Sequence, residues 1–209
     1  MLNQSLLEEK WNYRTHGFGF LLALFGAFWL LVNIDYQQNV QVLSVIIYSS
    51  SLSILYLVSF LYHYSTNRLY KRKLRILDHI SIYILIAGTY SPVTLITIYD
   101  SYGLEIFIAV WLLVLIGSSL KIFFTGRFEV ISLSLYLIIG WLIIFDISNL
   151  IGKVGIEGLV VLLAGGLVYS LGIIFYVREK MLFNHVIWHL FVMGGSFLHY
   201  IFIYNYVIK

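Results

Sequence analysis

The sequence predicts an all-α integral membrane protein, folded as a seven-transmembrane helix bundle. Of its 209 residues, 61% are hydrophobic and 11% are charged, and the mean hydropathy is +0.92. Soluble domains usually carry about twice that charged fraction. The charged residues also divide the apolar sequence into runs that suit spanning helices. We therefore expect one multi-pass domain in the cell membrane, with no sizeable soluble domain.

The composition also excludes some classes of site and partner. There is no cysteine, so disulfides and thiolate metal ligands are excluded. The net charge of +3 comes from basic residues clustered between apolar runs, which is not the pattern of a nucleic-acid-binding surface. We expect membrane lipids as partners and no nucleic acid, and the composition leaves homo-oligomerisation open.

Residues 4–14 are predicted to form a short amphipathic helix on the membrane surface. Ser5 and Glu8 have the spacing of a capping box, in which two side chains satisfy backbone N–H groups at a helix start. Leu6, Leu7 and Trp11 suit an apolar face at the interface. The polar, acidic character of this segment is not that of a cleavable signal peptide.

Seven apolar runs follow, and each is long enough to form a spanning helix. Such a helix needs about 20 mostly apolar residues. The predicted spans are 16–34, 42–64, 79–98, 104–124, 130–147, 156–177 and 185–206. Pro92, the only proline, lies inside the third span, where we expect a kink because membrane helices tolerate proline.

The basic residues predict the orientation of the bundle. With seven spans, one side receives the N-terminus and the loops after the second, fourth and sixth spans. That side holds eleven of the thirteen basic residues: Lys10, Arg14, Arg68, Lys71, Arg72, Lys73, Arg75, Lys121, Arg127, Arg178 and Lys180. The other side holds Lys153 and Lys209. Because basic loops favour the cytoplasm, we expect the N-terminus inside and the C-terminus outside.

Two histidines stand one helical turn apart at the start of the last span. The i, i+4 spacing of His185 and His189 places both imidazoles on one face of a helix. Histidine is costly inside a bilayer and often marks a functional site there. Taken alone, this pair is open to two interpretations, a metal site or hydrogen bonding to headgroups and backbone.

The predicted orientation brings three more polar residues to the same depth. His63 ends the second span, Asp78 precedes the third, and Ser59 lies one turn deeper than His63 on the same helix face. All of them then lie within about two turns of the cytoplasmic boundary. If spans two, three and seven are neighbours, three imidazoles and a carboxylate meet in one polar pocket.

This group of side chains suits zinc. Three imidazoles leave the fourth position of a tetrahedral zinc ion open, as in catalytic zinc sites. We expect Asp78 either to take that position or to hold a zinc-bound water, and Ser59 to donate a hydrogen bond beside it. Each residue also has a structural alternative: His63 at the boundary, Asp78 paired with Arg75 or at a helix start, and Ser59 bonded to its own backbone.

Four further ionisable residues are not expected to be metal ligands. His79 points about 100° around the helix from the preceding aspartate, which suits packing. His16 either lines the pocket or meets headgroups. His199 lies about 15 Å beyond the histidine pair along the helix axis, too far for the same ion. Asp146 is predicted to be a solvated residue at the outer end of the fifth span.

The chain resembles the haemolysin III family, within a larger group that includes the adiponectin and progestin receptors and the alkaline ceramidases. The resemblance begins with Glu9-Lys10-Trp11-Asn12 and Thr15-His16-Gly17, continues through Ser59-x-x-x-His63, Asp78-His79 and Ala87-Gly88-Thr89-Tyr90-Ser91-Pro92, and ends with His185-x-x-x-His189. It implies a seven-helix fold with zinc held by His63, His185 and His189. Asp78 then holds the metal-bound water and Ser59 lies beside it.

The predicted function is a zinc-dependent hydrolase of lipid amides or esters, similar to the ceramidases, with Zn²⁺ as cofactor and a membrane lipid as substrate. In this hypothesis Asp78 accepts the proton and passes it on, and Ser59 helps to stabilise the oxyanion. Two alternatives stay open. One is a pore-forming, cytolytic protein, and the other is a sensor or regulator of membrane state with structural zinc.

Overall fold

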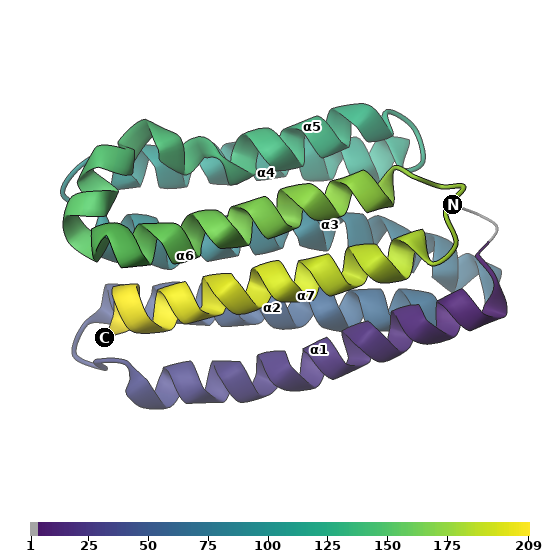
Figure 1. Ribbon diagram of the computed structural model, residues 1–209, viewed down its shortest axis with the longest axis horizontal. Helices are drawn as coiled ribbons and strands as arrows, with labels where there is room; N and C mark the ends of the chain where they lie inside the picture. Colours follow the sequence, from purple (N-terminus) through teal and green to yellow (C-terminus); the bar gives the residue numbers. More distant parts are fainter. Residues whose placement is uncertain (1–3) are drawn as a thin grey trace.

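The computed structural model describes residues 4–209, and over this range the protein is helical and contains no strand. Its seven α-helices run along a common direction (Figure 1). They are α1 (Leu6–Asn33), α2 (Asn39–Tyr64), α3 (Arg68–Pro92), α4 (Gly103–Phe124), α5 (Glu129–Gly140), α6 (Ile147–Tyr176) and α7 (Asn184–Phe202). Three short helices complete the fold: η1 (Val93–Thr97), η2 (Leu142–Asp146) and η3 (Ile203–Ile208).

The outer surface of the bundle is that of a membrane protein. Six stretches of the described chain are long and apolar enough to cross a membrane: Leu6–Asn33, Asn39–Tyr64, Arg68–Thr97, Gly103–Phe124, Glu129–Tyr176 and Asn184–Ile208. Large apolar side chains are exposed along them, with Phe25, Phe28 and Leu115 at 66%, 63% and 61% exposure. Soluble monomers rarely expose extensive apolar patches, so this surface is suited to lipid.

The stretch Glu129–Tyr176 reverses direction within itself. Gly155 has φ 69° and ψ 178°, a conformation essentially restricted to glycine, and it divides α6 into a short first part and a long second part. The long part returns along the bundle in the direction opposite to α5 (Figure 1). The predicted spans 130–147 and 156–177 lie on either side of this glycine.

The separate surface helix predicted for 4–14 is wrong, because α1 is a single helix of 28 residues. Its capping box is formed as predicted: Ser5 Oγ accepts from the Glu8 backbone N–H, and the Glu8 carboxylate accepts from the Ser5 N–H at 2.8 Å. Thr15 Oγ1 donates back to the Trp11 carbonyl at 3.0 Å, which suits an uninterrupted helix. Two acidic side chains of this segment contact other parts of the bundle: Glu8 contacts Phe183 at the start of α7, and Glu9 contacts α2 and α3.

Close packing places α2 between α1 and α3, while α7 packs on α6 and α1. At Gly88 the approach of α3 to α2 is very tight, because an added Cβ would lie 2.5 Å from the Cβ of Ser51. Only glycine allows this approach without a shift of backbone. At Pro92 the α-helix ends and η1 continues it as a π-helix, which is the local departure from α-helical geometry that proline favours.

An ion pair with a buried lysine joins α4 to the start of α5. Lys121, at 1% exposure, donates through Nζ to Glu129 Oε2 at 2.7 Å. Arg75 and His79 of α3 each lie 3.9 Å from the same carboxylate. His79 therefore points towards α4 and α5, in agreement with the packing role predicted for it.

The prediction that Asp146 is solvated is wrong, since its exposure is 3%. Its carboxylate accepts hydrogen bonds from Ser101 Oγ at 2.5 Å, from the Tyr102 N–H at 3.3 Å and from Asn149 Nδ2 at 2.5 Å. The loop between α3 and α4 supplies two of these donors. Asp146 therefore ties that loop to the beginning of α6.

Candidate metal centre

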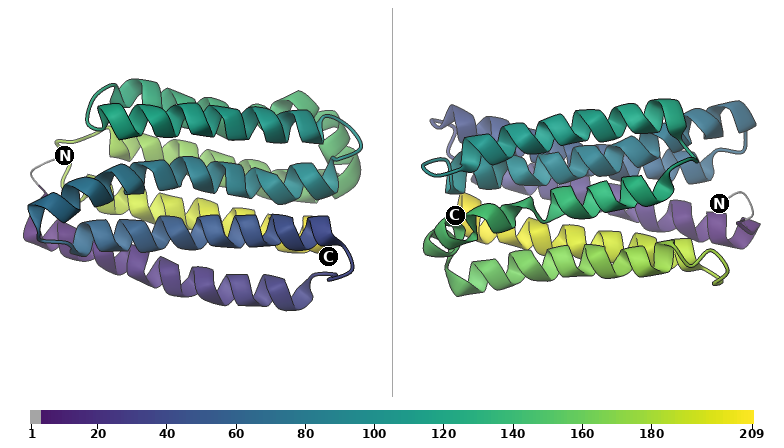
Figure 2. Two further views of the ribbon diagram at one scale, coloured as in Figure 1. Left: turned by 180° about the vertical axis from the view of Figure 1, so that it is seen from behind. Right: turned by 90° about the horizontal axis from the view of Figure 1, so that it is seen from above.

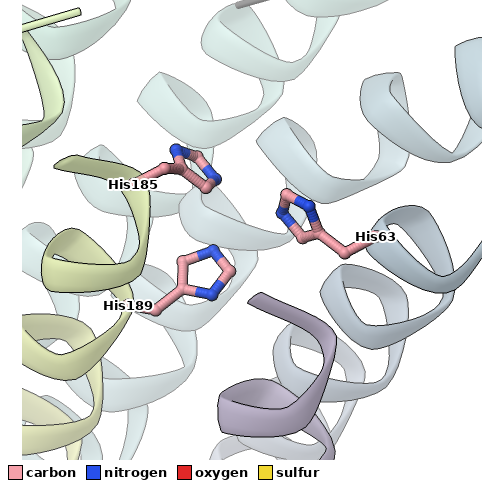
Figure 3. Close-up of side chains that lie close together, drawn as sticks. All are labelled: His63, His185 and His189. Atoms are coloured by element: carbon pink, nitrogen blue, oxygen red, sulfur yellow. The ribbon is translucent and has the colours of Figure 1, made fainter. Parts of the chain in front are cut away.

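Three imidazoles meet at one end of the bundle. His63 lies in the last turn of α2, and His185 and His189 lie in the first turns of α7; all three are buried. One ring nitrogen from each lies within 4.8 Å of the others, and Figure 3 shows the rings facing a common space. The ring centroids are 4.6 to 5.1 Å apart.

The ends of two helices produce this arrangement. The end of α2 and the beginning of α7 lie at the same end of the molecule, where α1 also begins (Figures 1 and 2). The i, i+4 spacing stacks His185 and His189 along one face of α7. The bundle therefore brings His63 close to two histidines that lie more than 120 positions later in the sequence.

The unpaired nitrogens of this cluster test its fit to a metal ion. Both ring nitrogens of His185 and Nε2 of His63 are buried and have no hydrogen-bond partner among residues 4–209. Each such group costs about 1–3 kcal/mol when nothing satisfies it. A cation bound through one lone pair of each ring relieves this cost at one nitrogen of His185 and at Nε2 of His63. A cluster of nitrogen ligands without thiolates fits Zn²⁺, and three of them leave one coordination position open.

Asp78 and Ser59, the other two residues predicted for this site, lie near the cluster. Ser59 is 2% exposed and faces the interior from α2, one turn deeper than His63. Asp78 is half-buried, and its carboxylate lies near the side chains of Ser59, His63 and Arg75. A carboxylate, a hydroxyl and three imidazoles therefore share one pocket.

His16 also belongs to the wall of this pocket. Its exposure is 3%, and its ring stacks on that of His189 with the centroids 3.6 Å apart and the planes 18° apart. Imidazole lone pairs lie in the ring plane, so two nearly parallel rings at this spacing do not direct them at one point. Of the two placements open for His16, the structure shows the pocket wall.

Glu9 is a neighbour of the cluster that sequence reasoning missed. Its Oε2 lies 2.8 Å from His63 Nδ1, and its Oε1 accepts from Lys71 Nζ at 2.8 Å. On α1, Thr15 Oγ1 also lies 3.3 Å from His189 Nδ1. Glu9 and Thr15 belong to the segments that carry the family resemblance. That resemblance was the feature of the sequence that could have identified both residues as part of the site.

An apolar cavity of about 100 Å³ lies deeper in the bundle. Its lining includes Leu55, Ile82, Ile86, Trp188, Val192 and His199. His199 Nε2 lies 3.2 Å from the Leu162 carbonyl, and the residue is no part of the imidazole cluster. The cavity begins one turn beyond Asp78 on α3, at Ile82.

The sequence profile of the family described as "Haemolysin-III related" matches residues 4–200. The chain belongs to this haemolysin III family. The match includes Glu9, the cluster histidines and Asp78, so the whole pocket lies within the family region. The resemblance inferred from the motifs is confirmed.

Curated relatives share nearly the full length of this haemolysin III protein. It is 38% identical to "Hemolysin-3 homolog" of Bacillus subtilis (strain 168), over 98% of this chain and 97% of that protein. It is 39% identical to "Hemolysin-3" of Bacillus cereus, over 99% and 95% of the two chains.

A more distant relative is "Monocyte to macrophage differentiation factor" of Homo sapiens, 27% identical over 97% of this chain and 85% of that protein. This similarity relates the chain to the wider group that contains the adiponectin and progestin receptors. No solved structure matches the chain significantly.

Proposed function

We propose that this haemolysin III protein is a zinc-dependent hydrolase of a membrane lipid amide or ester. The observation that supports it best is the buried cluster of His63, His185 and His189, with unpaired nitrogens and an adjacent carboxylate. A structural zinc site is normally closed by four protein ligands, whereas this cluster supplies three.

These three residues would hold the ion through ring nitrogens. Zinc bound in this way supplies a Lewis acid and a water whose pKa is about 7. Asp78 would accept a proton at its carboxylate and return it to the leaving group. Ser59 would donate a hydrogen bond to a substrate carbonyl oxygen as negative charge develops there.

A lipid substrate is supported by the surroundings of the site. Ile82 and Ile86 continue along α3 from Asp78, and Trp188 and Val192 flank His189 on α7; all four line the apolar cavity. Acyl chains gain free energy from contact with such walls by burial of apolar area. The polar pocket and the cavity would then receive the scissile carbonyl and part of a chain, respectively.

We also infer that the protein lies in the plasma membrane and crosses it seven times. The N-terminus would then lie in the cytoplasm. The reversal at Gly155 divides the stretch Glu129–Tyr176 into two legs that run in opposite directions. The first turn of α1 and the C-terminus lie at opposite ends of the bundle, which is consistent with an odd number of crossings. The metal centre would then lie on the cytoplasmic side.

Lipid turnover by the purified protein tests this function. Ceramide and a phospholipid ester are supplied in mixed micelles, and release of fatty acid is compared between wild type and Asp78→Asn. We expect Asp78→Asn to lower kcat by about 10²–10⁴-fold, the usual contribution of general acid–base catalysis. The zinc content should be retained, because the histidines are unchanged.

Asp100→Asn is the matched control, since Asp100 is exposed in the turn between η1 and α4. It should turn over lipid at the wild-type rate. Equal turnover by Asp78→Asn would contradict the role of this carboxylate. Absence of turnover, with a chelator-dependent loss of thermal stability, would instead favour a structural zinc and a regulatory protein.

A further inference from the structure

Glu9 bridges a histidine of the candidate metal centre and a lysine of the next helix. Its Oε2 lies 2.8 Å from His63 Nδ1 and its Oε1 lies 2.8 Å from Lys71 Nζ. The histidine side chain is 1% exposed and Glu9 is 21% exposed. One carboxylate from α1 thus contacts α2 and α3 with both oxygens.

The chemistry of these partners decides which nitrogen of His63 carries the proton. A carboxylate accepts hydrogen bonds, so Nδ1 must donate to it. In a neutral imidazole the other nitrogen, Nε2, then carries the lone pair. Nε2 is the buried nitrogen of His63 that has no hydrogen-bond partner in the described chain. Histidine ligands of metals often have such a carboxylate behind them, which fixes the ring and raises its basicity.

The preceding residue ties α1 to the start of α7 in a similar way. Glu8 Oε1 accepts from the Phe183 backbone N–H at 2.8 Å. Phe183 has φ 58°, a left-handed conformation that costs about 1–2 kcal/mol for such a residue. It stands two positions before His185. The first turn of α1 therefore holds both sides of the cluster, the end of α2 and the start of α7.

We propose that Glu9 is a positioning residue: it fixes the Nδ1–H tautomer of His63 and so presents the Nε2 lone pair to the metal ion. Lys71 orients the carboxylate that does this. The expected effect of Glu9 on zinc affinity rests on the zinc site of the proposed function. The tautomer itself is a property of the metal-free protein.

Glutamine at position 9 provides a sharp test, because its amide has one acceptor and one donor end. Lys71 can only donate, so the amide oxygen should face Lys71 and the NH₂ group should face His63. Nδ1 must then accept, and the proton moves to Nε2. Glu9→Gln should therefore lower zinc affinity by about 10–100-fold, the usual effect of losing such a partner.

Removing the lysine should reverse this effect. In the double variant Glu9→Gln/Lys71→Met the amide is free to turn its oxygen towards Nδ1, so the Nδ1–H tautomer and most of the zinc affinity should return. Lys71→Met alone keeps the carboxylate and should bind zinc almost as wild type does. Glu105→Gln, at an exposed position in the first turn of α4, is the matched control.

The measurements are zinc affinity by competition with a chelator and the His63 tautomer by ¹⁵N NMR of histidine-labelled, metal-free protein. The expected results are Nδ1–H in wild type, Nε2–H in Glu9→Gln, and Nδ1–H in the double variant. An Nε2–H or doubly protonated His63 in wild type would overturn the proposal. This measurement is made on the wild-type protein, so it does not depend on whether any variant folds. So would a double variant that binds zinc no better than Glu9→Gln.

These results separate the proposal from the proposed function. If wild type binds no zinc, the hydrolase proposal fails, and the tautomers of the metal-free proteins still decide the role of Glu9. If zinc binds and lipid is hydrolysed while the tautomer does not respond to position 9, only the role of Glu9 fails.

Discussion

His16 and His185 are both buried histidines with unpaired ring nitrogens, yet they are placed differently in the pocket. His185 offers a nitrogen that lies within 4.8 Å of those of His63 and His189. His16 lies flat against His189, so its lone pairs do not point at the same space. Ring orientation thus separates a proposed ligand from a wall residue of the same type.

This difference predicts the zinc content of two variants. His185→Ala should lower bound zinc well below one per chain, because two imidazoles remain. His16→Phe keeps a stacked ring and removes only the nitrogens, so it should retain about the wild-type zinc content. Elemental analysis of both purified proteins, alongside wild type, provides the measurement. Undiminished zinc in His185→Ala would count against the ligand set.

At the scale of elements, α1 shows how tertiary contacts change the meaning of an amphipathic segment. The polar residues of 4–14 suit a membrane surface when they are considered alone. In the structure Glu8 meets the loop before α7, Glu9 meets α2 and α3, and Asn12 is fully buried. This segment therefore continues without a break into the first membrane-spanning helix, because its partners lie within the bundle.

Asp146 is a second case, and it predicts a change in stability. Asp146→Ala removes the carboxylate that accepts three hydrogen bonds. Their donors are the Ser101 hydroxyl, the Tyr102 N–H and the Asn149 amide. Hydrogen bonds to a charged group contribute about 1.5–3 kcal/mol each, so the thermal unfolding temperature in detergent should fall clearly. Zinc content should not change, since the residue lies at the other end of the bundle from the cluster.

Asp100→Ala is the control for this effect. Asp100 pairs with Lys153 at 2.6 Å on the exposed surface, and the Lys153 ammonium holds the pKa of that carboxyl below its usual value. Exposed ion pairs contribute little to stability. If both variants unfold at the same temperature, the buried network of Asp146 is not a significant source of stability.

At the scale of the whole molecule, the number of crossings decides which residues face each compartment. Wild type has no cysteine, so single cysteines at Lys153, Glu179 and Lys209 report on sidedness without interference. With seven crossings, a membrane-impermeant maleimide added to intact cells should label positions 153 and 209 but not 179. All three should be labelled after permeabilisation.

Six crossings would give a different pattern. If Glu129–Tyr176 crossed only once, position 179 would become external and position 209 internal. Labelling of Glu179→Cys together with protection of Lys209→Cys would therefore refute the seven-crossing topology. It would also place the beginning of α7 on the opposite side from the end of α2, which is incompatible with the cluster of His63, His185 and His189.

The sequence by itself determined the membrane class, the helical composition and the three histidines that meet at one end of the bundle. These depend on hydropathy, on the i, i+4 spacing of His185 and His189, and on the depth at which His63 stands along its helix. Such properties are local, or follow from one orientation rule, and so they can be deduced from residue order.

The tertiary structure alone decided the continuity of α1, the burial of Asp146, the stacking of His16 and the bridge made by Glu9. Each depends on which helix lies opposite and on how its side chains are turned. The physical reason is that hydrogen bonds and ring contacts act over a few ångströms. Residues such as Glu9 and His63, distant in sequence, acquire these partners only when the bundle packs.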